Sequence, residues 1–131
     1  LGGDRFAANL AVMPDGVLYG YVDADDAVAL VKAHRARTPH LAHLRGVVGR
    51  DPHEQAALIA AAPLLDEAPW DRRLTTNVIR GGAHWSVGVR MGEVRVEVEG
   101  HDILTPPAPL TCTAAGPRAS LVPIVDAVTR R

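Results

Sequence analysis

Histidines are the residues of this 131-residue chain that first suggest chemistry, because imidazole binds metals and moves protons near neutral pH. His34, His40 and His43 lie close together in the sequence, and three imidazoles are enough for a zinc site. Pro39 interrupts this stretch, and no cysteine lies nearby in the sequence. The pattern therefore leaves two interpretations open, a metal site or ordinary loop and surface histidines, and it favours the second.

The other reactive residue types stand in contexts that favour structural roles. Cys112 is the only cysteine, so neither an intrachain disulfide nor a four-cysteine metal site can form from this chain alone. A lone cysteine beside an apolar segment is typical of a small core residue, although a nucleophilic thiol remains the alternative. Asp23, Asp25 and Asp26 resemble paired catalytic carboxylates, but they stand where a helix is expected to begin, which favours capping.

Composition excludes several classes of protein. The formal net charge is −1, and the arginines are scattered, so a nucleic-acid binder is not expected. No apolar run approaches the roughly 20 residues of a membrane span, so we expect no membrane partner and a cytoplasmic location. Hydrophobic residues make up 47% of the chain and charged residues 22%, which is typical of a globular domain.

The first third of the chain predicts a hairpin followed by a helix. Two apolar strands, Phe6 to Met13 and Val17 to Val22, flank the turn-forming Pro14-Asp15-Gly16, which indicates an antiparallel hairpin. Asp23 then provides the N-cap of a helix over about Ala24 to Ala36. A β-hairpin plus a helix is how a thioredoxin-like fold ends, so we expect the C-terminal part of that fold.

The remainder predicts a second helix and a small antiparallel β subdomain, which makes the class α/β. Thr38 to Pro52 is irregular, and a helix then begins with Asp51 as its N-cap and stops near Pro63. Alternation and turn residues place the later strands at Leu74–Arg80, Ala83–Arg90, Glu93–Gly100 and Leu121–Val128. Pro123 makes the last of these an edge strand. We expect residues 1–64 to close the thioredoxin-like domain and residues 65–131 to extend it.

The most specific pattern lies at the start of the chain. It reads Leu1-Gly2-Gly3-Asp4-Arg5-Phe6-Ala7-Ala8-Asn9-Leu10, then Met13-Pro14-Asp15-Gly16 and Leu18-Tyr19-Gly20. These residues resemble the sucrase/ferredoxin-like family, whose members share His-x-Gly-Gly-His/Asp-Arg-Phe-Ala and a hairpin ending in Pro-x-Gly-x-x-Tyr-Gly. A looser second block resembles the family at Leu44-Arg45-Gly46 and Gln55-Ala56-Ala57, and Thr111-Cys112-Thr113 falls where members often carry a Ser-Cys-Gly-like motif.

The resemblance implies a thioredoxin-like ferredoxin that binds a 2Fe–2S cluster for one-electron transfer. In the family two upstream cysteines ligate one iron, and the histidines of the Gly-Gly motif can supply further ligands, which raises the reduction potential. Here the first histidine position would precede Leu1, and the second is Asp4. The resemblance therefore implies that Gly2, Gly3, Asp4 and Arg5 surround the cluster.

Each of these residues has two possible roles. Asp4 is a weak candidate for a metal ligand through its oxygens, and the alternative is that it caps the loop or pairs with Arg5. Gly2 and Gly3 would let the backbone approach the cluster and donate N–H groups to its sulfurs. The alternative for the glycine pair is a tight turn before a strand.

We expect the chain to be a fragment of a longer protein, because it opens in the middle of this pattern without a methionine. The expected function is electron transfer through the 2Fe–2S cluster of the intact protein to an unknown redox partner protein. The fragment lacks most ligands, so it should bind no cluster by itself, and it would be part of an electron carrier and not of an enzyme. One alternative is a cluster-less thioredoxin-like binding or structural module, which Asp4 in place of histidine favours. A thiol enzyme that uses Cys112 is the third.

Overall fold

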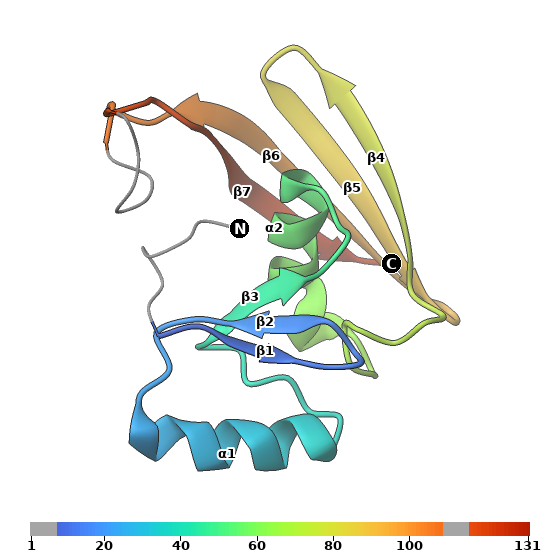
Figure 1. Cartoon of the computed structure of the whole chain (residues 1–131). Helices are drawn as coiled ribbons and strands as arrows, with labels where there is room; N and C mark the ends of the chain where they lie inside the picture. The colour runs from blue at the N-terminus through green and yellow to red at the C-terminus, as the bar shows by residue number, and fades with distance from the viewer. Residues whose placement is uncertain (1–7, 109–115) are drawn as a thin grey trace.

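A computed structural model describes residues 8–108 and 116–131. Gly2, Gly3, Asp4, Arg5 and Cys112 lie outside these ranges. The described residues form a three-stranded and a four-stranded antiparallel sheet with two α-helices, which confirms a mixed α/β class (Figure 1).

The three-stranded sheet contains the predicted hairpin. Strands β1 (Leu10–Val12) and β2 (Val17–Tyr19) pair antiparallel, and both are shorter than expected. Gly16 closes the turn between them at φ +69°, and its N–H donates to the carbonyl of Val12 at 2.9 Å. Strand β3 (Leu44–Val47) pairs with the other side of β2, inside a segment that the sequence predicted to be irregular.

Helix α1 (Ala24–Arg35) confirms the helix predicted after the hairpin. The Asp23 side chain accepts a hydrogen bond from the Asp26 N–H at 2.8 Å, so it is the predicted N-cap. The helix ends where Arg37 adopts a left-handed φ of +58°. Only Leu30 and His34 of this helix are buried, so α1 packs on the three-stranded sheet through a narrow stripe of side chains.

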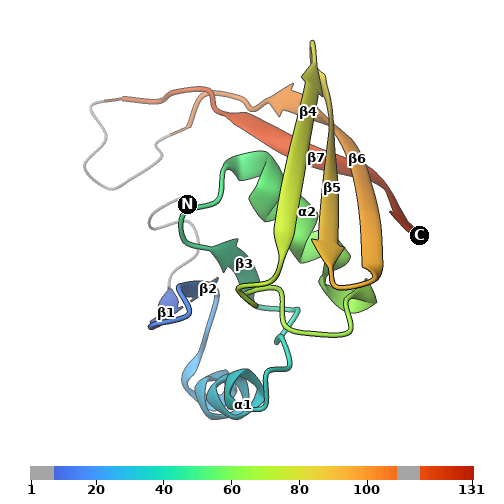
Figure 2. The same cartoon turned by 90° about the vertical axis from the view of Figure 1, so that its right-hand side faces the viewer.

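Helix α2 (Pro52–Ala61) also begins and ends close to where the sequence predicted. The Asp51 side chain accepts from the Glu54 N–H, the Glu54 side chain accepts from the Asp51 N–H, and Pro52 occupies the first turn. A 3₁₀ turn, η2 (Ala62–Leu64), follows. Figures 1 and 2 show α2 between the two sheets.

The four-stranded sheet is a meander in which strand order follows chain order. Its strands are β4 (Thr75–Gly81), β5 (His84–Met91), β6 (Val94–Leu104) and β7 (Leu121–Arg130). All four strands were predicted, although β6 runs further than Gly100. Strand β7 pairs only with β6 within the described sheet, as expected for an edge strand that contains Pro123.

The buried apolar side chains of the described residues form two clusters, one for each sheet. The larger one lies between α2 and the four-stranded sheet and includes Leu58, Trp85, Val87, Val89, Val96 and Val98. The smaller one joins the three-stranded sheet to α1 and includes Val17, Tyr19, Leu30, Leu44, Ala68 and Trp70. Trp70 follows residue 64 in the chain but packs in the same cluster as the first sheet. The division of the chain near residue 64 stays a prediction. No helix within the described ranges is long and apolar enough to cross a membrane.

Candidate functional site

The segment that precedes the hairpin enters the fold at one end of the three-stranded sheet. The Val22 N–H donates to the carbonyl of Ala8 at 3.1 Å, just before β1 begins at Leu10. Residues 2–5, the expected surroundings of a cluster, therefore lie a few residues upstream in the chain from this end of the sheet. Their own placement is outside the described residues.

A tyrosine and an arginine lie at this same end. Tyr21 has a left-handed φ of +58° and is 52% exposed. The guanidinium carbon of Arg45 lies 5.2 Å from the centre of the Tyr21 ring, which is a cation–π contact. The Arg45 guanidinium also donates to the carbonyl of Leu44 at 2.9 Å. The Arg45 guanidinium thus lies close to where the Ala8 segment joins the sheet.

Gly46 and Gln55, which both belong to the second block of residues that resemble the family, lie together in the structure. The side-chain oxygen of Gln55 on α2 accepts from the Val47 N–H at 2.7 Å, and its amide donates to the carbonyls of Val47 and Arg50. A Cβ at Gly46 would lie 1.6 Å from that oxygen, and Gly46 has a φ of +134°. Glycine at position 46 is therefore what allows Gln55 to fasten β3 to α2.

The cluster of three neighbouring histidines separates in the structure. His43 directs Nδ1 to the carbonyl of Gly20 at 3.1 Å and Nε2 to Asp26 at 3.2 Å, with the His40 ring 4.9 Å away. His34 instead points into the first core. Among residues 8–108 and 116–131, no three His, Cys, Asp or Glu side chains are grouped so that they could hold a metal ion.

His34 is not the loop or surface residue that the sequence favoured. It is 7% exposed, and its ring stacks on Trp70 with centroids 4.5 Å apart. Its two nitrogens contact the Tyr19 hydroxyl at 3.1 Å and the Asp15 carboxylate at 3.0 Å. Burial, and to a smaller extent Asp15, raises the pKa of Tyr19 to about 12, so this hydroxyl keeps its proton and remains a donor. The network ties α1 to the hairpin turn.

The acidic residues at the start of α1 serve the helix. A hydrogen bond from the backbone N–H of Asp26, with a smaller contribution from that of Asp25, lowers the pKa of the Asp23 carboxyl against the opposing effect of burial. Asp26 pairs with His43. Asp23 is therefore the predicted cap of the helix.

One partly buried pair has no local signal in the sequence. His53 Nε2 lies 2.9 Å and 3.1 Å from the two carboxylate oxygens of Asp102, a residue 49 positions away. The His53 ring also meets the edge of Trp85, with centroids 5.4 Å apart. This pair fastens α2 to β6, and only the sheet register brings its two members together.

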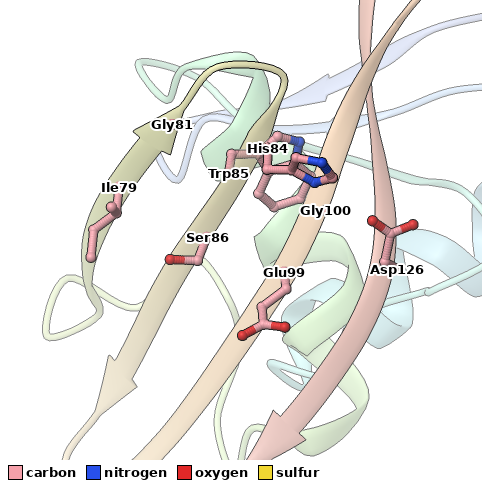
Figure 3. Close-up of a pocket in the computed structure, with 8 residues that line it drawn as sticks. All are labelled: Ile79, Gly81, His84, Trp85, Ser86, Glu99, Gly100 and Asp126. Atoms are coloured by element: carbon pink, nitrogen blue, oxygen red, sulfur yellow. The ribbon is translucent and has the colours of Figure 1, made fainter.

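The second sheet also has a hollow on the face turned away from α2. Strand alternation directs His84 and Ser86 outwards, and Trp85 inwards. The hollow measures about 340 Å³ and is lined by His84, Ser86, Glu99, Asp126 and the neighbouring Ile79, Gly81, Trp85 and Gly100 (Figure 3). The sequence identified none of these residues as a site.

No family model matches the chain, and no curated protein or solved structure matches it either.

Proposed function

We propose that this chain belongs to an electron carrier with a 2Fe–2S cluster, and that the three-stranded sheet with α1 closes a thioredoxin-like domain. The observation that carries the proposal is the Gly2-Gly3-Asp4-Arg5 motif followed, in the order of the family pattern, by a hairpin that turns at Asp15 and Gly16. The Gln55–Gly46 unit supports it, because it gives the second block of the resemblance a common structural role.

The described residues do not supply a ligand set for such a cluster. They include no cysteine and no group of three candidate ligands. The proposed cluster is therefore held by upstream cysteines and a histidine before Leu1, with Asp4 as an additional candidate ligand. Outer-sphere transfer of one electron requires no acid, base or nucleophile from this chain.

The roles proposed for this chain's residues are positional. Gly2 and Gly3 would let the backbone approach the cluster, and Arg5 and Asp4 would lie beside it. The Arg45 guanidinium lies at the same end of the sheet.

The test begins with the coding sequence upstream of Leu1. We expect a pair of cysteines there and a histidine immediately before Leu1. The longer protein, expressed anaerobically, should then contain iron and acid-labile sulfide in equal amounts and show visible absorption that bleaches on reduction. An upstream region without cysteines, or a start codon at Leu1, would overturn the proposal.

Variants of the longer protein then separate the roles of Asp4. If Asp4 is a ligand, Asp4→Ala changes the electron paramagnetic resonance spectrum of the reduced protein. If it only flanks the cluster, the spectrum is retained, as it should be in the control Asp66→Ala.

A cluster-less thioredoxin-like binding or structural module is the second candidate. Asp4 in the position of a histidine favours it. Longer protein that folds and stays free of iron after anaerobic expression and cluster reconstitution would support this candidate.

A further inference from the structure

Two histidines face each other across the second sheet. His84 on β5 and His101 on β6 are direct register partners. Directly opposed residues have Cβ atoms about 4.5–5.5 Å apart, so their side chains can reach a common point. Their ring centres are 6.3 Å apart, with an angle of 56° between the ring planes.

A carboxylate already orients one of these rings. His101 Nδ1 lies 2.8 Å and 3.0 Å from the two oxygens of Asp126 on β7. A carboxylate accepts hydrogen bonds, so Nδ1 carries the hydrogen, and the neutral ring then has its lone pair on Nε2. This is the arrangement in which carboxylates hold histidine ligands of metal ions.

The backbone beneath the pair is held firmly. The Asp102 N–H donates to the carbonyl of Ala83 at 2.8 Å, which extends the ladder beyond the pair. At Gly100 a Cβ would lie 2.3 Å from the Trp85 ring and 2.1 Å from the carbonyl oxygen of Ile124, so the strands approach closely there. Ligands on such a rigid element need only side-chain rotation to reach a bound ion.

The pair is also open to solvent. His84 is exposed, and the side chains of His101 and Asp126 are 36% and 47% exposed. In Figure 3 the His84 ring extends over β6 towards Asp126, whereas the Glu99 carboxylate lies further along the strand. An ion can therefore enter from the hollow and keep water as its remaining ligands.

We propose that His84 and His101 form a two-imidazole site for a late first-row divalent cation, with Asp126 positioning the His101 ring. Metal–nitrogen bonds of about 2.0–2.1 Å place two coordinated ring centres roughly 5–6 Å apart, slightly closer than they are here. Imidazole suits copper, nickel and zinc, and Cu²⁺ binds such a site most tightly. The inference is independent of the proposed cluster, because it uses other residues on the other sheet.

The test is calorimetric titration of the 131-residue chain with Zn²⁺ near neutral pH. The parent carries Cys112→Ser, which prevents the thiol from competing for the metal. One Zn²⁺ should bind per chain, and His84→Ala or His101→Ala should each abolish binding. Asp126→Asn should keep the stoichiometry and weaken affinity by about 10- to 100-fold, as expected for a residue that only orients a ligand. Cu²⁺ should bind more tightly than Zn²⁺ or Ni²⁺.

The matched control is His40→Ala, which removes a histidine of the other neighbouring pair and should leave Zn²⁺ affinity unchanged. Circular dichroism of each variant checks that it remains folded, and both target histidines lie on the outer face, where truncation leaves the core intact. A parent that binds no Zn²⁺, or binding that survives both His84→Ala and His101→Ala, would overturn the proposal. So would loss of binding in His40→Ala alone.

Discussion

At the scale of single residues, glycine 46 and glutamine 55 explain how a strand without a strong pattern is held in place. Strand β3 is short and contains a glycine, so neither alternation nor β-propensity revealed it. The strand pairs with β2, and two hydrogen bonds between the Gln55 amide and Val47 hold it to α2. The sequence showed both residues, but their contact depends on a φ of +134° that no local rule predicts.

The first prediction concerns Gly46→Ala. The new methyl group would displace the Gln55 amide, and the positive φ adds strain, so we expect a loss in the free energy of unfolding above the roughly 1–3 kcal/mol that backbone strain alone costs. Gly49→Ala is the control, because Gly49 has a φ of +87° but nothing within 4 Å of the added Cβ. Denaturant unfolding measures both, and equal losses would contradict the steric explanation.

The second prediction concerns the phenol of Tyr19. Its pKa is raised to about 12 in the folded protein, whereas the pKa of an exposed tyrosine is about 10. The stability that this proton contributes is complete below pH ~10 and is lost as the pH rises through about 12.

Unfolding curves across this pH range, in a Tyr21→Phe background, should therefore show a falling midpoint. Adding Tyr19→Phe should remove that part of the pH dependence. Phenolate absorbance that develops in the ordinary tyrosine range in the folded protein would contradict the prediction.

At the scale of elements, the sequence predicted the features that neighbouring residues determine, and it missed the contacts between residues that are far apart in the chain. Both helices carry their caps within the local sequence, so their starts at Asp23 and Asp51 were correct. The alternating strands of the meander were also correct. The His53–Asp102 pair and the opposed His84 and His101 were missed, because only the register of β6 brings them together. Residues 2–5, the predicted cluster surroundings, lie outside the described residues, so that prediction stays open.

The third prediction tests the cap of α2. Asp51→Ala removes the acceptor for the Glu54 N–H and the partner of Arg80, so unfolding free energy should fall by about 1 kcal/mol at neutral pH. Burial alone would raise the pKa of Asp51, but the N–H of Glu54 and the charge of Arg80 outweigh it and lower that pKa.

The contribution of Asp51 is therefore present above the ordinary aspartate pKa of about 4 and is lost as the pH falls further. Chemical denaturation at several pH values measures it. The difference between wild type and Asp51→Ala should shrink in acid, whereas the exposed Glu93→Ala should differ little from wild type at neutral pH. A constant difference down to strongly acidic pH would disprove the ionic part of the explanation.

At the scale of the whole molecule, α2 lies between the two sheets and links them. Its Leu58 is buried in the larger cluster, whereas Gln55 is bonded to β3. Each cluster also contains one of the two tryptophans, Trp70 in the smaller and Trp85 in the larger. The fluorescence of each tryptophan thus reports on one cluster.

The fourth prediction is that both clusters unfold together. The single-tryptophan variants Trp70→Phe and Trp85→Phe should each show a fluorescence midpoint that coincides with the midpoint from far-ultraviolet circular dichroism of the same variant. Shared contacts through α2 are the reason. If the fluorescence of Trp70 in Trp85→Phe changes at a lower denaturant concentration than the circular dichroism signal of that variant, the two clusters unfold as separate units.

The order of strands in the second sheet has a consequence for how the chain folds. Strands β4, β5 and β6 are joined by tight turns at Gly82 and Gly92, and each pairs with its neighbour in the chain. Most contacts within these three strands therefore close short loops, and low contact order is associated with fast folding. Strand β7 can pair with β6 only after the longer connection that follows Leu104 has brought the two strands together. We therefore expect β4, β5 and β6 to gain hydrogen-exchange protection early in refolding, with β7 following as the slower step.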